Sequence, residues 1–104
     1  MSDDGQPGDQ PGAQPGSARR LAEICNQKGL HARAAARFVK TASGFTADIQ
    51  VRKNGTWVSG RSIMGLMMLA AASGTVIEIA ASGADAEAAV ASLARLIECK
   101  FDED

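Results

Sequence analysis

The sequence predicts an α/β (α+β) fold, namely an open-faced two-layer sandwich in which three helices cover one face of a four-stranded antiparallel sheet. Segments with the periodicity of strands and of helices follow one another in the order βαββαβα, which contains a split βαβ unit of the ferredoxin-like kind with an extra helix at the end. The chain after a proline-rich N-terminal segment is about 85 residues long, which suffices for one hydrophobic core built from two layers.

Alternation and turn signals predict the four strands. Residues 47–52 alternate between apolar and polar side chains, as in a half-buried strand. Asn54-Gly55 then predicts a tight hairpin turn into a strand over Thr56–Ser59. A strand over Arg20–Cys25 is expected from its position before a turn, and another over Thr75–Ala80 from its β-branched residues.

Three segments have helical patterns. Ala32–Thr41 consists mostly of good helix formers, and Gly44 follows as a stop signal. A short helix is expected over Ser62–Leu69, and a third helix begins near Asp85. The apolar residues of the third helix recur at spacings of three and four, as in an amphipathic helix on a sheet; they are Ala86, Ala89, Val90, Leu93 and Leu96 or Ile97.

The only histidine of the chain, His31, lies where the first helix should begin, and Gly29 breaks the chain just before it. A helix N-terminus offers unpaired backbone N–H groups and the positive end of the helix dipole, so a phosphoryl group on this histidine would be stabilised. Arg33 adds a permanent cation whose donors fit phosphate oxygens. Neutral imidazole is a nucleophile and also a good leaving group, so His31 suits reversible phosphoryl transfer. On the histidine alone, an ordinary structural residue at a helix start is an equal alternative.

The short helix predicted over Ser62–Leu69 has two apolar sides. At the helical period one side consists of Leu66, Leu69 and Ala70, and the other consists of Ile63, Met64, Met67 and Met68. A short helix on a sheet needs only one apolar face, so the methionine side is a candidate docking surface; burial of both sides is the alternative. Ser62 is well placed as the N-cap.

Two motifs, Asn26–Arg33 (NQKGLHAR) and Gly60–Met67 (GRSIMGLM), resemble those of the histidine-containing phosphocarrier family HPr of the bacterial phosphoenolpyruvate-dependent phosphotransferase system. The resemblance runs from about Arg19 to Glu98. It implies the open-faced sandwich fold of that family. Two departures are Ala34, where many members have proline, and Met68, where many have a small polar residue.

The resemblance implies that His31 accepts a phosphoryl group from enzyme I on its Nδ1 atom and passes it to an enzyme IIA, with Arg33 stabilising the charge. Such a protein is not an enzyme but a carrier that is itself a phosphorylated intermediate. Ser62 matches the regulatory site that HPr kinase/phosphorylase phosphorylates in many relatives, and the positions that contact partners in the family correspond to Ile63, Met64 and Met67. A regulatory binding module that uses the Ser62 helix, with His31 idle, is the alternative. The sequence leaves open whether the pathway is sugar transport or a nitrogen-related regulatory branch.

Charge is unevenly distributed although the net charge is −1. Residues 28–61 contain seven Lys and Arg residues and one acidic residue, whereas the remainder contains four basic and eleven acidic residues. This predicts a basic surface around the histidine helix, including Arg37 and Lys40, that steers acidic partner proteins. The basic stretch lacks interleaved aromatic residues, which argues against nucleic-acid binding.

Residues 1–18, with three Gln-Pro-Gly repeats and almost no apolar surface, are predicted to be a disordered tail, and residues 19–104 to be the phosphocarrier domain. No signal-peptide pattern and no apolar run of membrane-spanning length is found, so we expect a cytoplasmic monomer without membrane insertion. Neither Cys25 nor Cys99 has a second cysteine or a histidine at metal-ligand spacing, which predicts two reduced, partly buried thiols and no metal, disulfide or cofactor.

Overall fold

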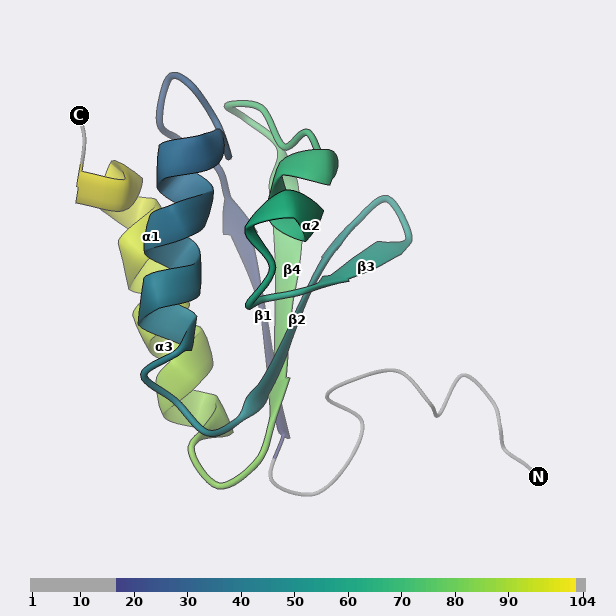
Figure 1. Cartoon of the computed structure of the whole chain (residues 1–104), viewed down its shortest axis with the longest axis vertical. Helices are drawn as coiled ribbons and strands as arrows, with labels where there is room; N and C mark the ends of the chain where they lie inside the picture. The colour runs from purple at the N-terminus through teal and green to yellow at the C-terminus, as the bar shows by residue number, and fades with distance from the viewer. Residues whose placement is uncertain (1–16, 103–104) are drawn as a thin grey trace.

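The computed structural model describes residues 17–102, which form one four-stranded sheet with helices packed on one side (Figure 1). The elements, in chain order, are β1 (Ser17–Glu23), α1 (Ala32–Ala42), β2 (Asp48–Lys53), β3 (Thr56–Ser59), α2 (Ile63–Met68), β4 (Val76–Ser82), α3 (Ala86–Glu98) and a 3₁₀ turn, η2 (Lys100–Asp102). Most of the predicted tail, residues 1–16, lies outside the described residues.

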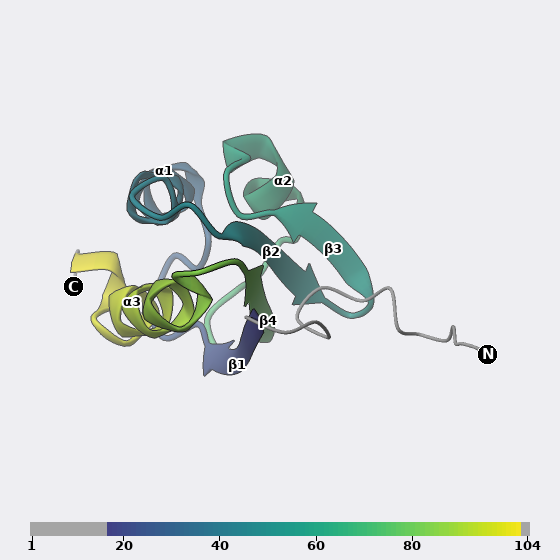
Figure 2. The same cartoon turned by 90° about the horizontal axis from the view of Figure 1, so that it is seen from below.

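The strand order is β1-β4-β2-β3, and every neighbouring pair is antiparallel. Seen from below, α1, α2 and α3 all lie on the same side of this sheet (Figure 2). The predicted order of elements and the open-faced two-layer sandwich are therefore confirmed.

The core lies between the sheet and the helices. Apolar side chains of the two central strands face the helices, as the alternation predicted. Fully buried members from the sheet are Ile49, Val51, Ile77 and Ile79, and those from the helices are Phe38, Leu66, Leu93 and Ile97. Because one continuous core joins all three helices to the sheet, the position of each helix end is fixed by packing.

The first strand begins earlier than the sequence predicted. Ser17 and Ala18 pair with Ser82 and Ala81 of β4, so β1 starts three residues before the predicted Arg20 and includes two residues that were assigned to the tail. The alternation at this end is weak, because an edge strand needs little apolar surface, and the partner strand defines where pairing begins. At its other end β1 stops at Glu23, two residues before the predicted Cys25.

The hairpin between β2 and β3 is confirmed. Asn54 and Gly55 both have positive φ, 52° and 83°, as the tight two-residue turn requires. The prediction that Ala70 lies on the buried side of α2 with Leu66 and Leu69 is wrong for Ala70. This residue is exposed, lies outside the helix and has a φ of 53°, whereas Leu66 and Leu69 are buried as predicted. The helix ends one residue before Leu69, so the helical period no longer places Ala70 on the buried side.

The start of α3 is tied to the segment before β2 by Asp85. Its carboxylate accepts hydrogen bonds from the backbone N–H groups of Thr46 (2.9 Å) and Ala47 (2.8 Å) and makes no side-chain cap to its own helix. The hydrogen bond from Thr46 is the main reason that the pKa of Asp85 lies below its ordinary value, because it stabilises the charged form.

Candidate functional site

His31 is the N-cap of α1. Its backbone is extended (φ −78°, ψ −178°), and its carbonyl oxygen accepts the first helical hydrogen bond, from Ala35 N–H at 2.8 Å. The imidazole makes no capping bond to the helix, and the first turn of α1 contains no acidic residue. The leading N–H groups and the positive dipole end of α1 are thus not neutralised by a side chain of the helix itself.

A tight turn over Asn26–Leu30 precedes His31 and connects it to β1. The Asn26 side chain is fully buried, and its Nδ2 donates to the carbonyl oxygen of Gly29 at 2.8 Å. Gly29 has a φ of 66°, and a Cβ at this position would lie 2.5 Å from the carbonyl oxygen of Ala71. Leu30 N–H donates to that same oxygen at 2.9 Å. The glycine is required both by its backbone conformation and by close contact with the segment after α2.

The turn and the segment after α2 enclose a shallow groove of about 240 Å³ beside the histidine. It is lined by Lys28, Leu30 and His31 on one side and by Ala70, Ala71 and Ala72 on the other. Ala70–Ala72 were not predicted to be part of the site, because these alanines come near His31 only through the fold.

Arg33 is exposed in the first turn of α1, two residues after His31. Its guanidinium is therefore available at the same helix end as the imidazole. The half-buried His31, the exposed Arg33 and the N–H groups of the first turn together form an end of the helix that can hold a tetrahedral anion.

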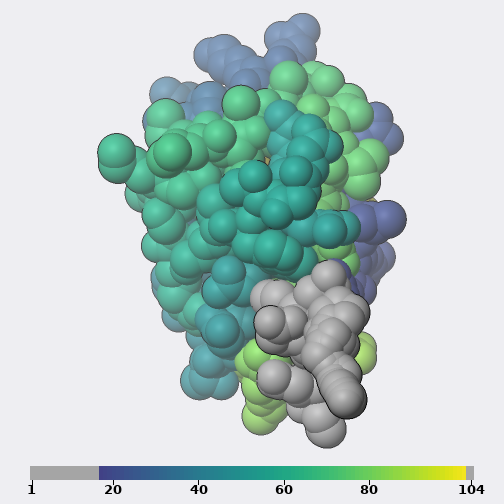
Figure 3. Space-filling view, turned by 90° about the vertical axis from the view of Figure 1, so that its right-hand side faces the viewer, coloured from purple at the N-terminus to yellow at the C-terminus, as the bar shows by residue number. Residues whose placement is uncertain are grey.

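Helix α2 lies beside the N-terminal half of α1 (Figure 1). On its other side it lies beside the β2–β3 hairpin (Figure 3). It is capped as predicted: Ser62 Oγ accepts the N–H of Gly65 at 2.9 Å. The expectation that its second apolar side is exposed is met, since that side is 41–80% exposed, whereas Leu66 is fully buried. We call this side the methionine face; it consists of Ile63, Met64, Met67 and Met68.

The predicted basic surface is smaller than expected, because several of its cations are bound to other parts of the protein. Arg61 donates to the carbonyl oxygens of Ala42 and Ala47 at 3.1 and 3.0 Å and so joins the start of α2 to the end of α1. Arg52 pairs with Glu78 at 2.9 Å on the sheet face that the helices leave uncovered. Arg61 is thus held by backbone carbonyls and Arg52 by a carboxylate, and a count of charges along the sequence reveals neither contact.

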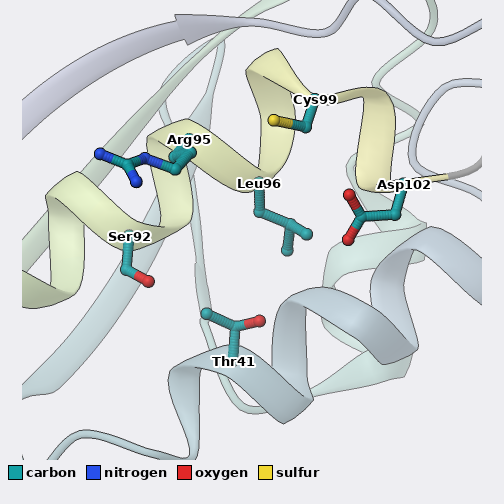
Figure 4. Close-up of a pocket in the computed structure, with 6 residues that line it drawn as sticks. All are labelled: Thr41, Ser92, Arg95, Leu96, Cys99 and Asp102. Atoms are coloured by element: carbon teal, nitrogen blue, oxygen red, sulfur yellow. The ribbon is translucent and has the colours of Figure 1, made fainter.

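Two further members of the predicted surface lie along α1. Arg37 donates to the carbonyl oxygen of Phe101 at 2.6 Å, whereas Lys40 is exposed. Both line a groove between α1 and α3, on the flank of α1 away from α2. An adjoining part of that groove contains side chains of both helices and of η2: Thr41, Ser92, Arg95, Leu96, Cys99 and Asp102 (Figure 4).

The two cysteines are free thiols and are exposed, not partly buried as expected. Cys25 follows β1 and donates to the carbonyl oxygen of Ile97 at 3.2 Å, so it lies over the end of α3 and not within the core. Within residues 17–102, no three His, Cys, Asp or Glu side chains are grouped so that they could hold a metal ion. Among the same residues, no helix combines the length and the apolar character of a membrane span.

Comparison with known proteins gives consistent matches. A family model described as PTS HPr component phosphorylation site matches residues 18–99. A phosphocarrier protein HPr from Neisseria meningitidis is 54% identical over 85 residues, which cover 82% of this chain and 96% of the relative. A phosphocarrier protein NPr from Shewanella violacea is 40% identical over 84 residues, covering 81% and 92%. The crystal structure of HPr-C-His from Thermoanaerobacter tengcongensis superposes with a TM-score of 0.80 at 46% identity, covering 84% of this chain and 98% of that one.

Proposed function

Since the chain belongs to the HPr family of phosphocarrier proteins of the phosphotransferase system, we propose that His31 accepts a phosphoryl group from phospho-enzyme I and donates it to an enzyme IIA-type protein. The observation that carries the proposal is the position of His31 as the N-cap of α1, with no acidic side chain in the first turn. Enzyme I and the acceptor are the partners that this role requires. A cytoplasmic location is proposed with it.

In the accepting step, a ring-nitrogen lone pair of neutral His31 attacks phosphorus. The bond from phosphorus to the donor atom of phospho-enzyme I breaks as the new N–P bond forms, so the phosphoryl group simply changes its bonding partner. The donating step is the same exchange in reverse with the acceptor, and it needs a nitrogen that is a good leaving group. We propose Nδ1 as the reacting nitrogen, because the resemblance to the HPr family implies that atom.

The surroundings of His31 would stabilise the negative charge of the phosphoryl group in both steps. Backbone N–H groups of the first turn and the dipole of α1 act without rearrangement, since the helix is already formed. Arg33 supplies a full positive charge that matches phosphate oxygens. We therefore propose that Arg33 contributes to the rate of transfer, whereas His31 is indispensable.

The methionine face is the proposed docking surface for partner proteins. Arg37 and Lys40, on the flank of α1 away from α2, are proposed as separate charged contacts. An exposed apolar surface with flexible thioether side chains can fit partners of different shape. Ser62 at the start of α2 is the proposed regulatory site: its phosphorylation would leave the cap in place and add negative charge beside the methionine face.

The exposed methionine face also favours a second candidate, a regulatory binding module in which His31 is not phosphorylated. The two are separated by incubating the protein with phosphoenolpyruvate and enzyme I and reading its intact mass before and after mild acid. We expect one acid-labile phosphoryl group, absent in His31→Ala and retained in the docking variant Met64→Ala at a lower rate. No gain of mass with an enzyme I that phosphorylates another carrier would favour the binding module.

A further inference from the structure

Lys53, the last residue of β2, binds the chain where α2 ends. Its Nζ donates to the carbonyl oxygens of Leu69 at 3.0 Å and Ala70 at 3.1 Å. Leu69 is the C-cap of α2, and carbonyl oxygens at a helix C-terminus lack helical donors and lie at the negative end of the dipole. A lysine ammonium supplies the missing donors and a positive charge at the negative end of the dipole, so this contact is stronger than a neutral hydrogen bond.

The turn that Lys53 holds is unfavourable by itself. Ala70 has a φ of 53°, in the left-handed region that residues with a Cβ avoid. The ammonium of Lys53 donates to the carbonyl oxygens of both Leu69 and Ala70. This pair of charged hydrogen bonds favours the left-handed turn over a more relaxed backbone conformation.

The next two residues touch the turn that carries His31. Ala71 accepts the N–H of Leu30 at 2.9 Å, and Gly29 fits against Ala71 and Ala72 so closely that an added Cβ would lie 2.5 and 2.9 Å from their backbones. Leu30 is bonded directly to His31. A displacement of Ala71 would therefore move the peptide unit that precedes the imidazole.

We propose that Lys53 is a positioning residue for the phosphoryl-transfer histidine. It fixes the left-handed turn after α2, and through the bond from Leu30 to Ala71 it fixes the orientation of His31 at the start of α1. The inference rests on the proposed function of His31, and it assigns Lys53 no contact with the phosphoryl group. Misplacement of a reacting group by even a fraction of an ångström lowers transfer rates, because the N–P bond forms only along one line of approach.

The test compares Lys53→Met, which removes the ammonium, with Lys53→Arg, which keeps a cation and donors at this position. Lys100→Met is the matched control, because it removes an exposed lysine in η2, after the end of α3. Three quantities are measured for each variant: the single-turnover rate of phosphorylation by phospho-enzyme I, the hydrogen-exchange rate of the Leu30 amide, and the imidazole resonances of His31 during a pH titration.

For Lys53→Met we expect phosphorylation to be about tenfold slower, Leu30 amide exchange to be faster, and the His31 resonances to shift, with most of the rate recovered in Lys53→Arg. Lys100→Met should match the unmodified protein in all three measured quantities.

An unchanged rate in Lys53→Met would overturn the inference and leave the proposed function intact. If the unmodified protein takes no phosphoryl group, the proposed function fails; unchanged Leu30 exchange and His31 resonances would then refute the positioning as well, and changed ones would support it. Should Lys53→Met fail to fold, Lys53→Gln, which keeps a neutral donor, is judged by the same outcomes.

Discussion

Helices α1 and α3 begin in opposite ways. At α3, the carboxylate of Asp85 ties the helix start to Thr46 and Ala47, and Glu87 stands in the first turn. Neither His31 nor Asp85 caps its own helix through its side chain, but α1 has no acidic residue at its N-cap or in its first turn. Acidic residues near a helix start stabilise it by neutralising the dipole. Acidic residues therefore stabilise the start of α3. The start of α1 lacks this stabilisation, and its dipole remains available to an anion.

The glycines before the two helices allow the sharpest separation of stability from function. Gly29 precedes α1 with a φ of 66°, and Gly83 precedes α3 with a φ of 135°. A Cβ at Gly83 would lie 3.0 Å from Ala47 Cα, and one at Gly29 would lie 2.5 Å from Ala71 O. We predict that either change to alanine lowers the free energy of unfolding by roughly 2–3 kcal/mol, measured by urea denaturation.

Only Gly29→Ala should also slow the phosphorylation of His31, because only that turn carries the histidine. The rates are compared at a temperature where both variants remain folded. Equal slowing in Gly83→Ala would mean that the loss reflects general instability and not the shape of the α1 start.

Placing an acidic residue in the first turn of α1 should make its start resemble that of α3. Ala32 is exposed and is the first residue of the helix, so Ala32→Glu adds the missing charge without disturbing the core. We predict stabilisation by about 0.5 kcal/mol and phosphorylation slower by roughly tenfold or more, since the carboxylate repels the incoming phosphoryl group. Stability is read from thermal unfolding and the rate from phosphoryl transfer.

Ala36→Glu is the control, because it adds the same charge at an exposed position one turn further along α1. It should leave the rate within about twofold, since screening weakens the repulsion over the added distance. A similar loss of rate in both variants would contradict the special role of the first turn.

Helix α2 provides a third start, with a neutral cap. Ser62→Ala removes the acceptor for Gly65 N–H and should lower the free energy of unfolding by about 1 kcal/mol. Ser62→Asp keeps an acceptor and should leave the melting temperature nearly unchanged, while it slows phosphorylation by enzyme I through charge repulsion at the docking surface. Unchanged melting temperature together with an unchanged rate in Ser62→Asp would contradict the regulatory assignment.

The smallest expected effect is at the α3 start and concerns pH. The pKa of Asp85 is lowered in the folded protein, chiefly by the hydrogen bond from Thr46 N–H, so its stabilising effect is full well above the ordinary value of 3.8 and is lost progressively as the pH falls below that value. Asp85→Asn should be slightly less stable than the unmodified protein at pH 7, and the difference should shrink as the pH falls from 3.8 toward 2. A difference that is undiminished at pH 2 would mean that ionisation of Asp85 is not its cause. Phosphoryl transfer to His31 should be unaffected.

Local patterns in the sequence were sufficient to predict the order of the elements and the position of His31 at the start of a helix. The alternation over residues 47–52, the Asn54-Gly55 turn and the glycine before His31 each depend on neighbours a few residues away. For the same reason Ser62 could be recognised as a cap, since its partner Gly65 is three residues further on.

The rest of the site depends on contacts between distant segments. Lys53 binds carbonyl oxygens 16 and 17 residues away, and Arg61 binds others 14 and 19 residues away, so a count of charges placed both on a free basic surface. Ala70 was assigned to the buried side of α2 because its left-handed backbone is imposed by the fold and not by its own propensity. Backbone carbonyls as partners of cations leave no pattern in a sequence.

The central claim is that the open start of α1 holds a phosphoryl group on His31. The most direct measurement is NMR spectroscopy of the 15N-labelled protein after phosphorylation by enzyme I and phosphoenolpyruvate, with coupling between 31P and the imidazole nitrogens as the readout. We expect coupling to Nδ1 of His31 and large shifts of the amide resonances of Ala32, Arg33 and Ala34. Phosphorus on any other side chain, or phosphorylated His31 with these three amides unmoved, would contradict it.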